Sequence, residues 1–183
     1  MQIKSTLIGL FALSTMLSGR APAQPAAEPT AEHKILATEE GTWDATVKSF
    51  MAGPDAEPTI TKGTETNTIL TGGMWLLSKF EGEFAGAKFE GRGQFGYDVS
   101  KGKYVGTWID SMSPTMTILE GTYDASKKTM TYVGENVMPD GKTKYTQKMM
   151  TTTKADGSRE FTLYMKMDKD EVKLMEVTYI KRK

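Results

Sequence analysis

The sequence predicts an all-β fold, an antiparallel up-and-down β-barrel of about ten strands with a short helix at its N-terminal side. After Gly41, short runs rich in Thr, Val, Ile, Met and aromatic residues alternate between apolar and polar positions, as half-buried strands do. Turn-forming pairs such as Gly72-Gly73 and Asp156-Gly157 separate these runs. A meander of this length has two exposed edges unless it closes on itself, so we expect a barrel.

The helix is expected just before the first strand. Thr30 is a candidate N-cap and Gly41 is a stop signal, and Ile35 and Leu36 between them supply an apolar face. The alternating pattern then predicts ten strands, at Trp43–Met51, Thr59–Leu70, Met74–Phe84, Lys88–Tyr97, Tyr104–Asp110, Thr115–Tyr123, Thr129–Val137, Lys142–Thr153, Arg159–Met167 and Val172–Lys181.

The first residues have the features of a secretory signal peptide. Lys4 precedes an apolar run that extends from Ser5 to about Leu17, and Ala21-Pro22-Ala23 has the small residues of a cleavage site. The run is shorter than the roughly 20 apolar residues of a membrane-spanning helix, and no later segment comes close to that length. We therefore expect a signal peptide at 1–23, cleavage near Ala23, a periplasmic or secreted protein and no membrane insertion.

The composition limits the function classes further. Residues 24–31 are rich in Ala, Pro and Glu and predict a flexible leader, which leaves 32–183 for a single barrel domain. Removal of 1–23 would leave a formal net charge of −2, so we expect no nucleic-acid partner. The chain has no cysteine and only one histidine, His33, so we expect no disulfide, no multi-histidine metal site and no cofactor.

The segment Gly91–Gly96 spells Gly-x-Gly-x-x-Gly, the pattern of dinucleotide-binding loops. Such a loop needs a helix to start within it, but here the pattern lies inside a predicted strand. Alternation puts its first two glycines on one strand face with Phe89, Phe95 and Tyr97. These glycines either make room for a bulky side chain or leave a slot for a ligand.

We expect the barrel interior to bind a small, largely apolar, lipid-like molecule, because barrels of about this strand number can enclose one ligand. Methionines in the late strands, among them Met149, Met165 and Met175, fit either a filled core or such a cavity. The candidate ligand-binding residues combine aromatic surface with one carboxylate, and they are Phe89, Phe95, Tyr97, Tyr104, Trp108 and Asp110.

Two alternatives stay open, and neither assigns a catalytic residue from a recognisable motif. The chain could be an enzyme in which Asp110 or Asp98 is a general base, although an Asp at a turn commonly bonds nearby backbone instead. It could also be a protein-interaction module with a filled core. Protein partners are not identified by the sequence.

Two resemblances add to this reading. Gly41-Thr42-Trp43, after a helix, resembles the opening of lipocalins and other calycin barrels, where a Trp closes the base and a basic residue of the last strand packs over it. This implies structural roles for Trp43 and for Lys181 or Arg182, by a cation over an aromatic face. The chain lacks the C-terminal histidine with which nitrobindin-like barrels hold haem.

The wider pattern resembles a more particular family. The segments "EHKILATEEGTWDATVKSFM", "FEGRGQFGYDVSKGKYVGTWIDSMSPTM" and "EGTYDASKKTM" are similar to the bacterial family called domain of unknown function 1579. The resemblance extends from about Glu32 to Arg182. It implies membership of that family, which has no established activity.

Overall fold

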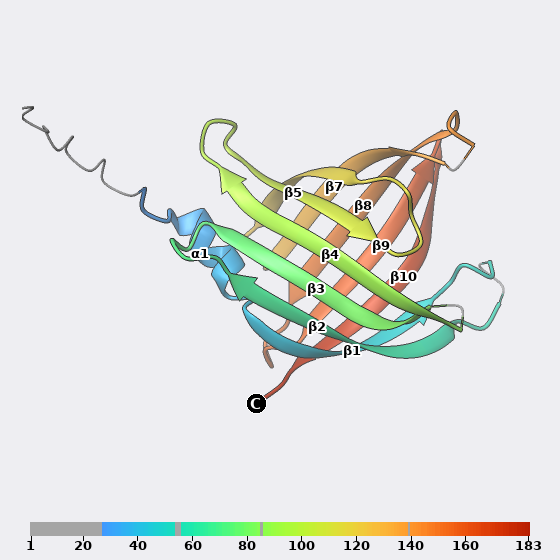
Figure 1. Ribbon diagram of the computed structural model, residues 1–183, viewed down its shortest axis with the longest axis horizontal. Helices are drawn as coiled ribbons and strands as arrows, with labels where there is room; N and C mark the ends of the chain where they lie inside the picture. The colour runs from blue at the N-terminus through green and yellow to red at the C-terminus, as the bar shows by residue number, and fades with distance from the viewer. Residues whose placement is uncertain (1–26, 54–55, 85, 139) are drawn as a thin grey trace, which may run out of the picture.

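The computed structural model describes residues 27–53, 56–84, 86–138 and 140–183. These residues form a closed barrel of ten antiparallel strands preceded by one short helix, which confirms the predicted fold class (Figure 1). The expected signal peptide at 1–23, its cleavage site near Ala23 and the start of the leader lie outside the described residues. Residues 27–30 have no regular secondary structure, and the helix begins at Ala31.

Each predicted strand has one counterpart in the structure, and the bounds differ only at the strand ends. The helix α1 is Ala31–Ala37. The strands are β1 Gly41–Ser49, β2 Thr59–Ile69, β3 Trp75–Phe84, β4 Ala87–Asp98, β5 Lys103–Asp110, β6 Thr117–Asp124, β7 Thr129–Val137, β8 Lys144–Thr153, β9 Arg159–Met167 and β10 Asp170–Lys181.

Every strand pairs with the next one along the chain, and β1 closes the barrel by pairing with β10. The closing pair runs in register from Trp43 opposite Lys181 to Ser49 opposite Met175. Because side chains alternate along a strand, one residue in two faces the interior. A single irregularity in β10, between Lys173 and Met175, shifts the register with β9.

The helix α1 covers one end of the barrel (Figure 1). The backbone N–H of Thr30 donates to Nδ1 of His33 at 3.1 Å, which closes the first helical turn. Leu36 is buried in the core, and the Tyr104 hydroxyl of β5 donates to the carbonyl of Glu32 at 3.3 Å. We call the covered end the base and the opposite end, where β1 and β9 finish, the mouth.

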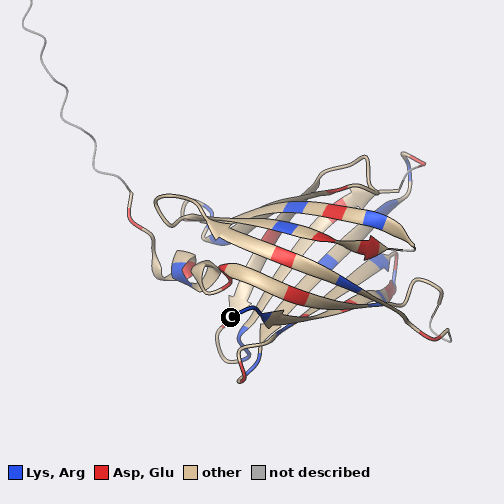
Figure 2. Cartoon of the chain, turned by 60° about the horizontal axis from the view of Figure 1, so that its bottom comes forward, with Lys and Arg blue, Asp and Glu red and all other residues tan. Residues whose placement is uncertain are grey.

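Charged residues of both signs are spread along the strands (Figure 2). Several form exposed ion pairs between strands, such as Lys103 with Glu120 at 2.7 Å. Exposed pairs of this kind add little to stability, so the fold depends on its interior. In the described part of the chain, no helix is long and apolar enough to cross a membrane.

The interior holds two clusters of buried side chains. One contains Leu36, Leu76, Tyr104, Leu119, Met130 and Tyr132, and the other contains Trp43, Ala45, Val47, Phe80, Val177 and Tyr179. Trp108 packs against both clusters. Most of these residues lie in the half of the barrel next to the base, so the core is not distributed evenly along the barrel.

Candidate functional site

The base is closed by a buried arginine between two aromatic rings. Arg159, at the start of β9, has a side chain that is 3% exposed and forms ion pairs with Glu39 at 2.6 Å and with Glu65. Its guanidinium carbon lies 3.9 Å from the centre of the Trp43 ring and 4.8 Å from that of Tyr179. A guanidinium over an aromatic face gains a cation–π attraction that increases as water is excluded.

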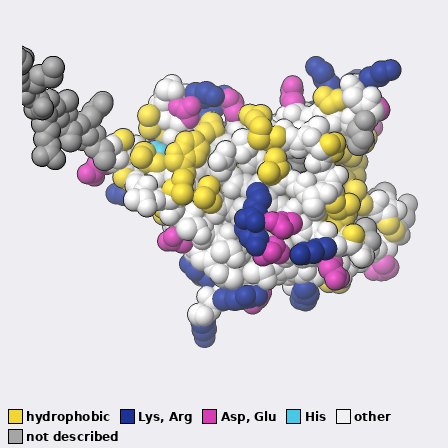
Figure 3. Space-filling model, viewed as in Figure 1, with side chains coloured by type: hydrophobic (Ala, Val, Ile, Leu, Met, Phe, Trp, Pro, Cys, Tyr) yellow, Lys and Arg dark blue, Asp and Glu magenta, His cyan; other side chains and the backbone are white. Residues whose placement is uncertain are grey.

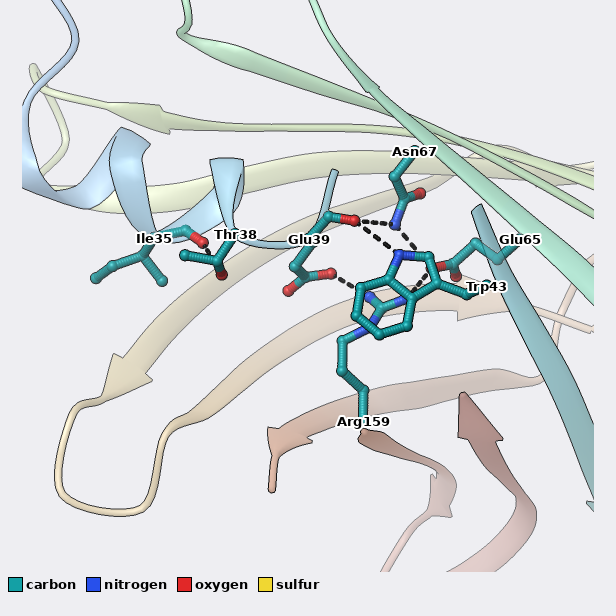
Figure 4. Close-up of polar contacts among 7 residues, drawn as sticks. All are labelled: Ile35, Thr38, Glu39, Trp43, Glu65, Asn67 and Arg159. Atoms are coloured by element: carbon teal, nitrogen blue, oxygen red, sulfur yellow. Dashed lines mark hydrogen bonds and ion pairs between the residues drawn. The ribbon is translucent and has the colours of Figure 1, made fainter. Parts of the chain in front are cut away.

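Side-chain amide and indole groups bind the backbone of Glu39 and the carboxylate of Glu65 in this cluster (Figure 4). The Trp43 indole N–H and the Asn67 amide both donate to the Glu39 carbonyl, at 3.0 Å and 3.1 Å. The Asn67 amide also donates to Oε1 of Glu65 at 2.8 Å. The segment that joins α1 to β1 is therefore tied to the barrel wall. We call Glu39, Trp43, Glu65, Asn67, Arg159 and Tyr179 the base network.

Burial dominates the electrostatics of the base network. Burial raises the pKa of Glu39 above its ordinary value, although the Arg159 charge acts in the opposite direction. Burial alone would lower the pKa of Arg159, but the carboxylates of Glu65 and Glu39 raise it, so the guanidinium stays charged. Burial and then Glu65 raise the pKa of Tyr179 well above its ordinary value.

The predicted cation over Trp43 comes from two side chains. Lys181 of β10 places its Nζ 5.3 Å from the Trp43 ring centre, but the closer cation is Arg159, which was not predicted from the sequence. Arg182 lies on the outer surface and pairs with Asp44 at 2.6 Å. A signal for Arg159 existed, because it falls on the same face of its strand as Phe161 and Leu163, where a charge is unexpected.

Aromatic rings fill the middle of the barrel along β4 to β7. A Cβ atom added at Gly91 would lie 2.2 Å from the Trp108 ring, and one added at Gly93 would lie 2.6 Å from the Phe95 ring. The two glycines therefore make room for Trp108 and Phe95, and the slot considered for a ligand is occupied by side chains. The Tyr132 ring covers Gly121 in the same way, at 2.6 Å.

The mouth half of the interior is different, because several of its apolar side chains are only partly buried. The register aligns inward residues of β8, β9 and β10, with Met149 opposite Leu163 and Leu163 opposite Met175. The partly exposed apolar residues on this wall are Met149, Phe161, Leu163, Met165 and Met175, which we call the mouth wall. Water therefore reaches apolar groups on the inner face of a closed barrel.

A hollow of about 600 Å³ lies at the mouth. It is lined by Met165, Met167 and Val172 with charged residues at its edge, among them Lys142, Lys144, Asp168 and Asp170. Hydrophobic side chains are exposed at both ends of the molecule (Figure 3), and those on the loops and strand ends of the mouth include Met51, Met112, Met116, Met167 and Val172. The mouth thus combines an apolar rim with an apolar wall inside it.

Polar groups also lie in the mouth half, on β7 and on β8, which is itself a strand of the mouth wall. The buried amide of Asn136 donates to Oγ1 of Thr117 at 2.9 Å and to Oε1 of Gln147 at 3.0 Å. Tyr145 has a raised pKa, because of burial and then the nearby charge of Asp110. The mouth half therefore has hydrogen-bonding groups next to its apolar wall.

The six residues predicted to bind a ligand all face the interior, but they do not form one site. Tyr97 and Tyr104 pack together at the base, with ring centres 5.1 Å apart. Phe95 and Trp108 fill the middle, as described above. Phe89 and Asp110 lie toward the mouth, where Gly91 of β4 is opposite Asp110 of β5. All six lie on β4 and β5, whereas the mouth wall is formed by the later strands β8 to β10.

The two aspartates considered as a general base are structural and lie far apart. Asp98 ends β4 and Asp110 ends β5, at opposite ends of the barrel and so roughly 20 Å apart along the strand. Asp98 accepts from Ser100, and this bond lowers its pKa, which makes it a weak base. Both oxygens of Asp110 are occupied, one by the Trp108 indole at 3.1 Å and the other by backbone N–H groups, including that of Met112 at 2.9 Å.

Other surfaces offer less for a ligand. The described residues contain no group of three or more His, Cys, Asp or Glu side chains placed to bind a metal ion. A hollow of about 900 Å³ on the outer wall surrounds Gly63 and Gly82 and is lined mostly by charged side chains, including the pair of Asp44 and Arg182. Charged groups of both signs at the surface are well hydrated, so this hollow does not suit an apolar molecule.

A family model described as "Protein of unknown function (DUF1579)" matches residues 28–181. The match covers α1 and all ten strands and confirms the resemblance expected from the sequence. No curated protein matches the chain. Because the family description names no activity, the function must be argued from the site.

Proposed function

We propose that this chain, which belongs to the family of unknown function DUF1579, binds a small, largely apolar molecule in the mouth half of its barrel. The observation that carries the proposal is the incomplete burial of the mouth wall. Phe161, Leu163 and Met165 face the interior of a closed barrel and are still partly exposed. A barrel with a filled core would bury these side chains, since apolar surface left in contact with water is unfavourable.

The dimensions and composition of the mouth support the same proposal. The hollow of about 600 Å³ is within the range of roughly 300 to 1,000 Å³ that small-molecule sites occupy. Methionine side chains such as Met149, Met165 and Met175 are unbranched and polarizable, so they adapt to guests of irregular shape. An interaction module with a filled core would need neither feature.

We further propose that the protein is exported and binds its ligand in the periplasm or outside the cell. The support is the sequence of the N-terminus, with Lys4, the apolar run that follows it and the cleavage-type residues Ala21-Pro22-Ala23. Mass spectrometry of the protein isolated from its own host gives the mature N-terminus directly. A start near residue 24 supports export, and an intact Met1 contradicts it.

The binding proposal is tested first by native mass spectrometry of the processed protein, purified without detergent from its own host. We expect an extra mass that disappears on denaturation and is recovered in an organic extract. The apo protein should then bind pyrene, a hydrocarbon without polar groups, with a change in pyrene fluorescence. An apo protein that neither carries an extra mass nor binds pyrene contradicts the proposal.

A matched pair of variants locates the site. Leu163→Trp adds volume to the mouth wall, whereas Thr162→Trp adds the same side chain at the neighbouring position of β9, which faces outward. We expect the first variant to weaken pyrene binding by about tenfold or more, which corresponds to about 1.4 kcal/mol. The second should bind pyrene as the wild type does. Equal effects of the two variants would place the bound pyrene outside the barrel.

A further inference from the structure

The side-chain amide of Gln147 has a fixed orientation in the mouth half. Its Oε1 accepts a hydrogen bond from the buried amide of Asn136 at 3.0 Å. The same amide donates to Oγ1 of Thr117 at 2.9 Å, so both N–H groups of Asn136 are used. Gly134, directly opposite Gln147 in β7, has no side chain that would separate Asn136 from Gln147. Because Oε1 of Gln147 faces Asn136, its two N–H groups are directed away from Asn136.

Gln147 lies next to the mouth wall. In the pairing of β8 with β9 it is directly opposite Met165, and opposite residues of this kind have Cβ atoms about 5 Å apart. Met165 lines the hollow at the mouth. Both side chains face the interior and are still partly exposed, so solvent reaches them through the mouth. The side chain of Gln147 forms no other hydrogen bond with a described residue, so its N–H groups are free to bind a ligand.

Tyr145 adds a second hydrogen-bond donor, closer to the mouth. It precedes Gln147 by two residues in β8 and therefore lies on the same inner face. Its side chain is partly exposed, and its hydroxyl forms no hydrogen bond with a described residue. Burial, and then the charge of Asp110, raises its pKa above the ordinary value, so the hydroxyl stays protonated at neutral pH and can donate.

The acceptor groups around these two donors are already occupied. Oε1 of Gln147 accepts from Asn136, and the two oxygens of Asp110 accept from the Trp108 indole and from backbone N–H groups. The groups that β8 offers to a ligand are therefore mainly donors. An ammonium group also carries only donors, so it would find no partner here. A ligand oxygen is the matching group.

The nearby charges disfavour an oxygen that belongs to an anion. Asp110 is the charge that acts on Tyr145, and it would repel a carboxylate bound at the same place. The hollow at the mouth has two lysines, Lys142 and Lys144, and two aspartates, Asp168 and Asp170, so it adds no net positive charge. A carboxylate that left water would therefore lack a compensating charge.

We propose that the ligand is an uncharged amphiphile with a hydrocarbon body against the mouth wall and a carbonyl oxygen that accepts hydrogen bonds from the Gln147 amide and the Tyr145 hydroxyl. This inference rests on the function proposed above and adds the chemical class of the ligand. Long-chain ketones, aldehydes and esters belong to this class, whereas fatty acid anions and long-chain amines do not.

The first test compares three probes with twelve carbon atoms each, 2-dodecanone, dodecanoate and dodecylammonium. Each competes with pyrene for the apo protein at neutral pH, below its solubility limit. We expect 2-dodecanone to bind at least about tenfold more tightly than either ion. Equal or tighter binding of an ion overturns the inference while leaving the apolar site intact. If pyrene binds and 2-dodecanone does not, the inference alone fails, and if neither binds, both proposals fail.

The second test removes the Tyr145 hydroxyl. Tyr145→Phe should weaken 2-dodecanone binding by about two- to tenfold, as expected for one hydrogen bond, and should leave pyrene binding unchanged. Its Tm should match that of the wild type, because the hydroxyl forms no hydrogen bond with a described residue. Tyr164→Phe on the outer face of β9 is the control and should change neither affinity.

The third test removes the donors of Gln147 and keeps its acceptor. Gln147→Glu still accepts the hydrogen bond from Asn136 but has no N–H group for a ligand. We expect 2-dodecanone binding to fall at least about twofold more than pyrene binding in this variant. If both Tyr145→Phe and Gln147→Glu keep the wild-type ratio of the two affinities, the inference is overturned. A changed ratio in one variant only overturns the role of the other residue.

Discussion

The two ends of the barrel are built from the same ten strands but differ in how far their inner side chains are exposed to solvent. At the base, α1 and the base network exclude solvent, and Trp43 and Arg159 are each 3% exposed. At the mouth no helix covers the strands in the described part of the chain, and Met167 is 38% exposed. The strand pattern alone therefore does not decide whether a barrel end is closed.

The strand β9 shows how side-chain burial changes from the base to the mouth. Along the inward face of β9, Arg159 is buried, Phe161, Leu163 and Met165 are partly exposed, and Met167 is exposed. The buried end holds a charge, which is the side chain that is hardest to bury, and the exposed end holds apolar groups. This is the reverse of what core packing alone would select, and it distinguishes a closed base from a mouth that is open to solvent.

Arg159→Met is expected to lower the unfolding free energy more than any other change considered, because it removes the cation of the base network. The variant keeps the bulk of the side chain but leaves Glu39 and Glu65 buried without their cation. Removing one partner from a buried ion pair costs about 3 to 5 kcal/mol of unfolding free energy. Urea unfolding followed by circular dichroism measures this loss.

Arg182→Met is the matched control for the base. Its guanidinium also pairs with a carboxylate, Asp44, but the pair is on the outer surface. Exposed pairs contribute little, so we expect no measurable change in the unfolding free energy in the same urea titration. A loss for Arg182→Met as large as that for Arg159→Met would mean that closure of the base depends on total charge rather than on the buried network.

The same substitution, methionine to alanine, compares the base half of the barrel with the mouth half. Met130 is 3% exposed near the base, whereas Met165 is partly exposed in the mouth wall. Met130→Ala should cost about 2 to 5 kcal/mol, because the buried site loses apolar contacts and gains a cavity. Met165→Ala should cost clearly less, since water already reaches that side chain. Equal losses in urea unfolding would mean that the mouth half is packed like the core.

The fold was predictable because its signals are local. Alternation within each run and a turn after each run are both visible in about ten consecutive residues, and they gave ten strands and the two faces of β4, but not which of these faces points inward. The strand ends were less well defined, and β10 starts at Asp170 rather than at Val172. Hydrogen bonding extends past the residues whose pattern marks the strand.

The site was less predictable because it depends on side chains that meet across the barrel. Phe89, Gly91 and Gly93 do share a face, but only the position of Trp108 shows that the space above the two glycines is filled. Arg159 meets Glu39 and Glu65 from positions 120 and 94 residues away. No spacing within a short segment encodes such contacts. The strand faces could therefore be predicted from the sequence, whereas the side-chain contacts across the barrel interior could not.

The smallest effect expected is a pH dependence that distinguishes the buried base from the outer wall. Burial raises the folded-state pKa of Glu39 above its ordinary value of 4.5, so the ionised carboxylate destabilises the fold at higher pH, and this penalty disappears as the pH falls toward about 4.5. Glu39→Gln carries no such charge, so its unfolding free energy relative to the wild type should be highest near neutral pH and should decline on acidification. Glu120→Gln should give the opposite slope, because its hydrogen bond with Lys103 lowers the Glu120 pKa and the wild type loses that contribution in acid. Slopes of the same sign in a series of urea titrations would show that the base network, like the outer wall, is open to solvent.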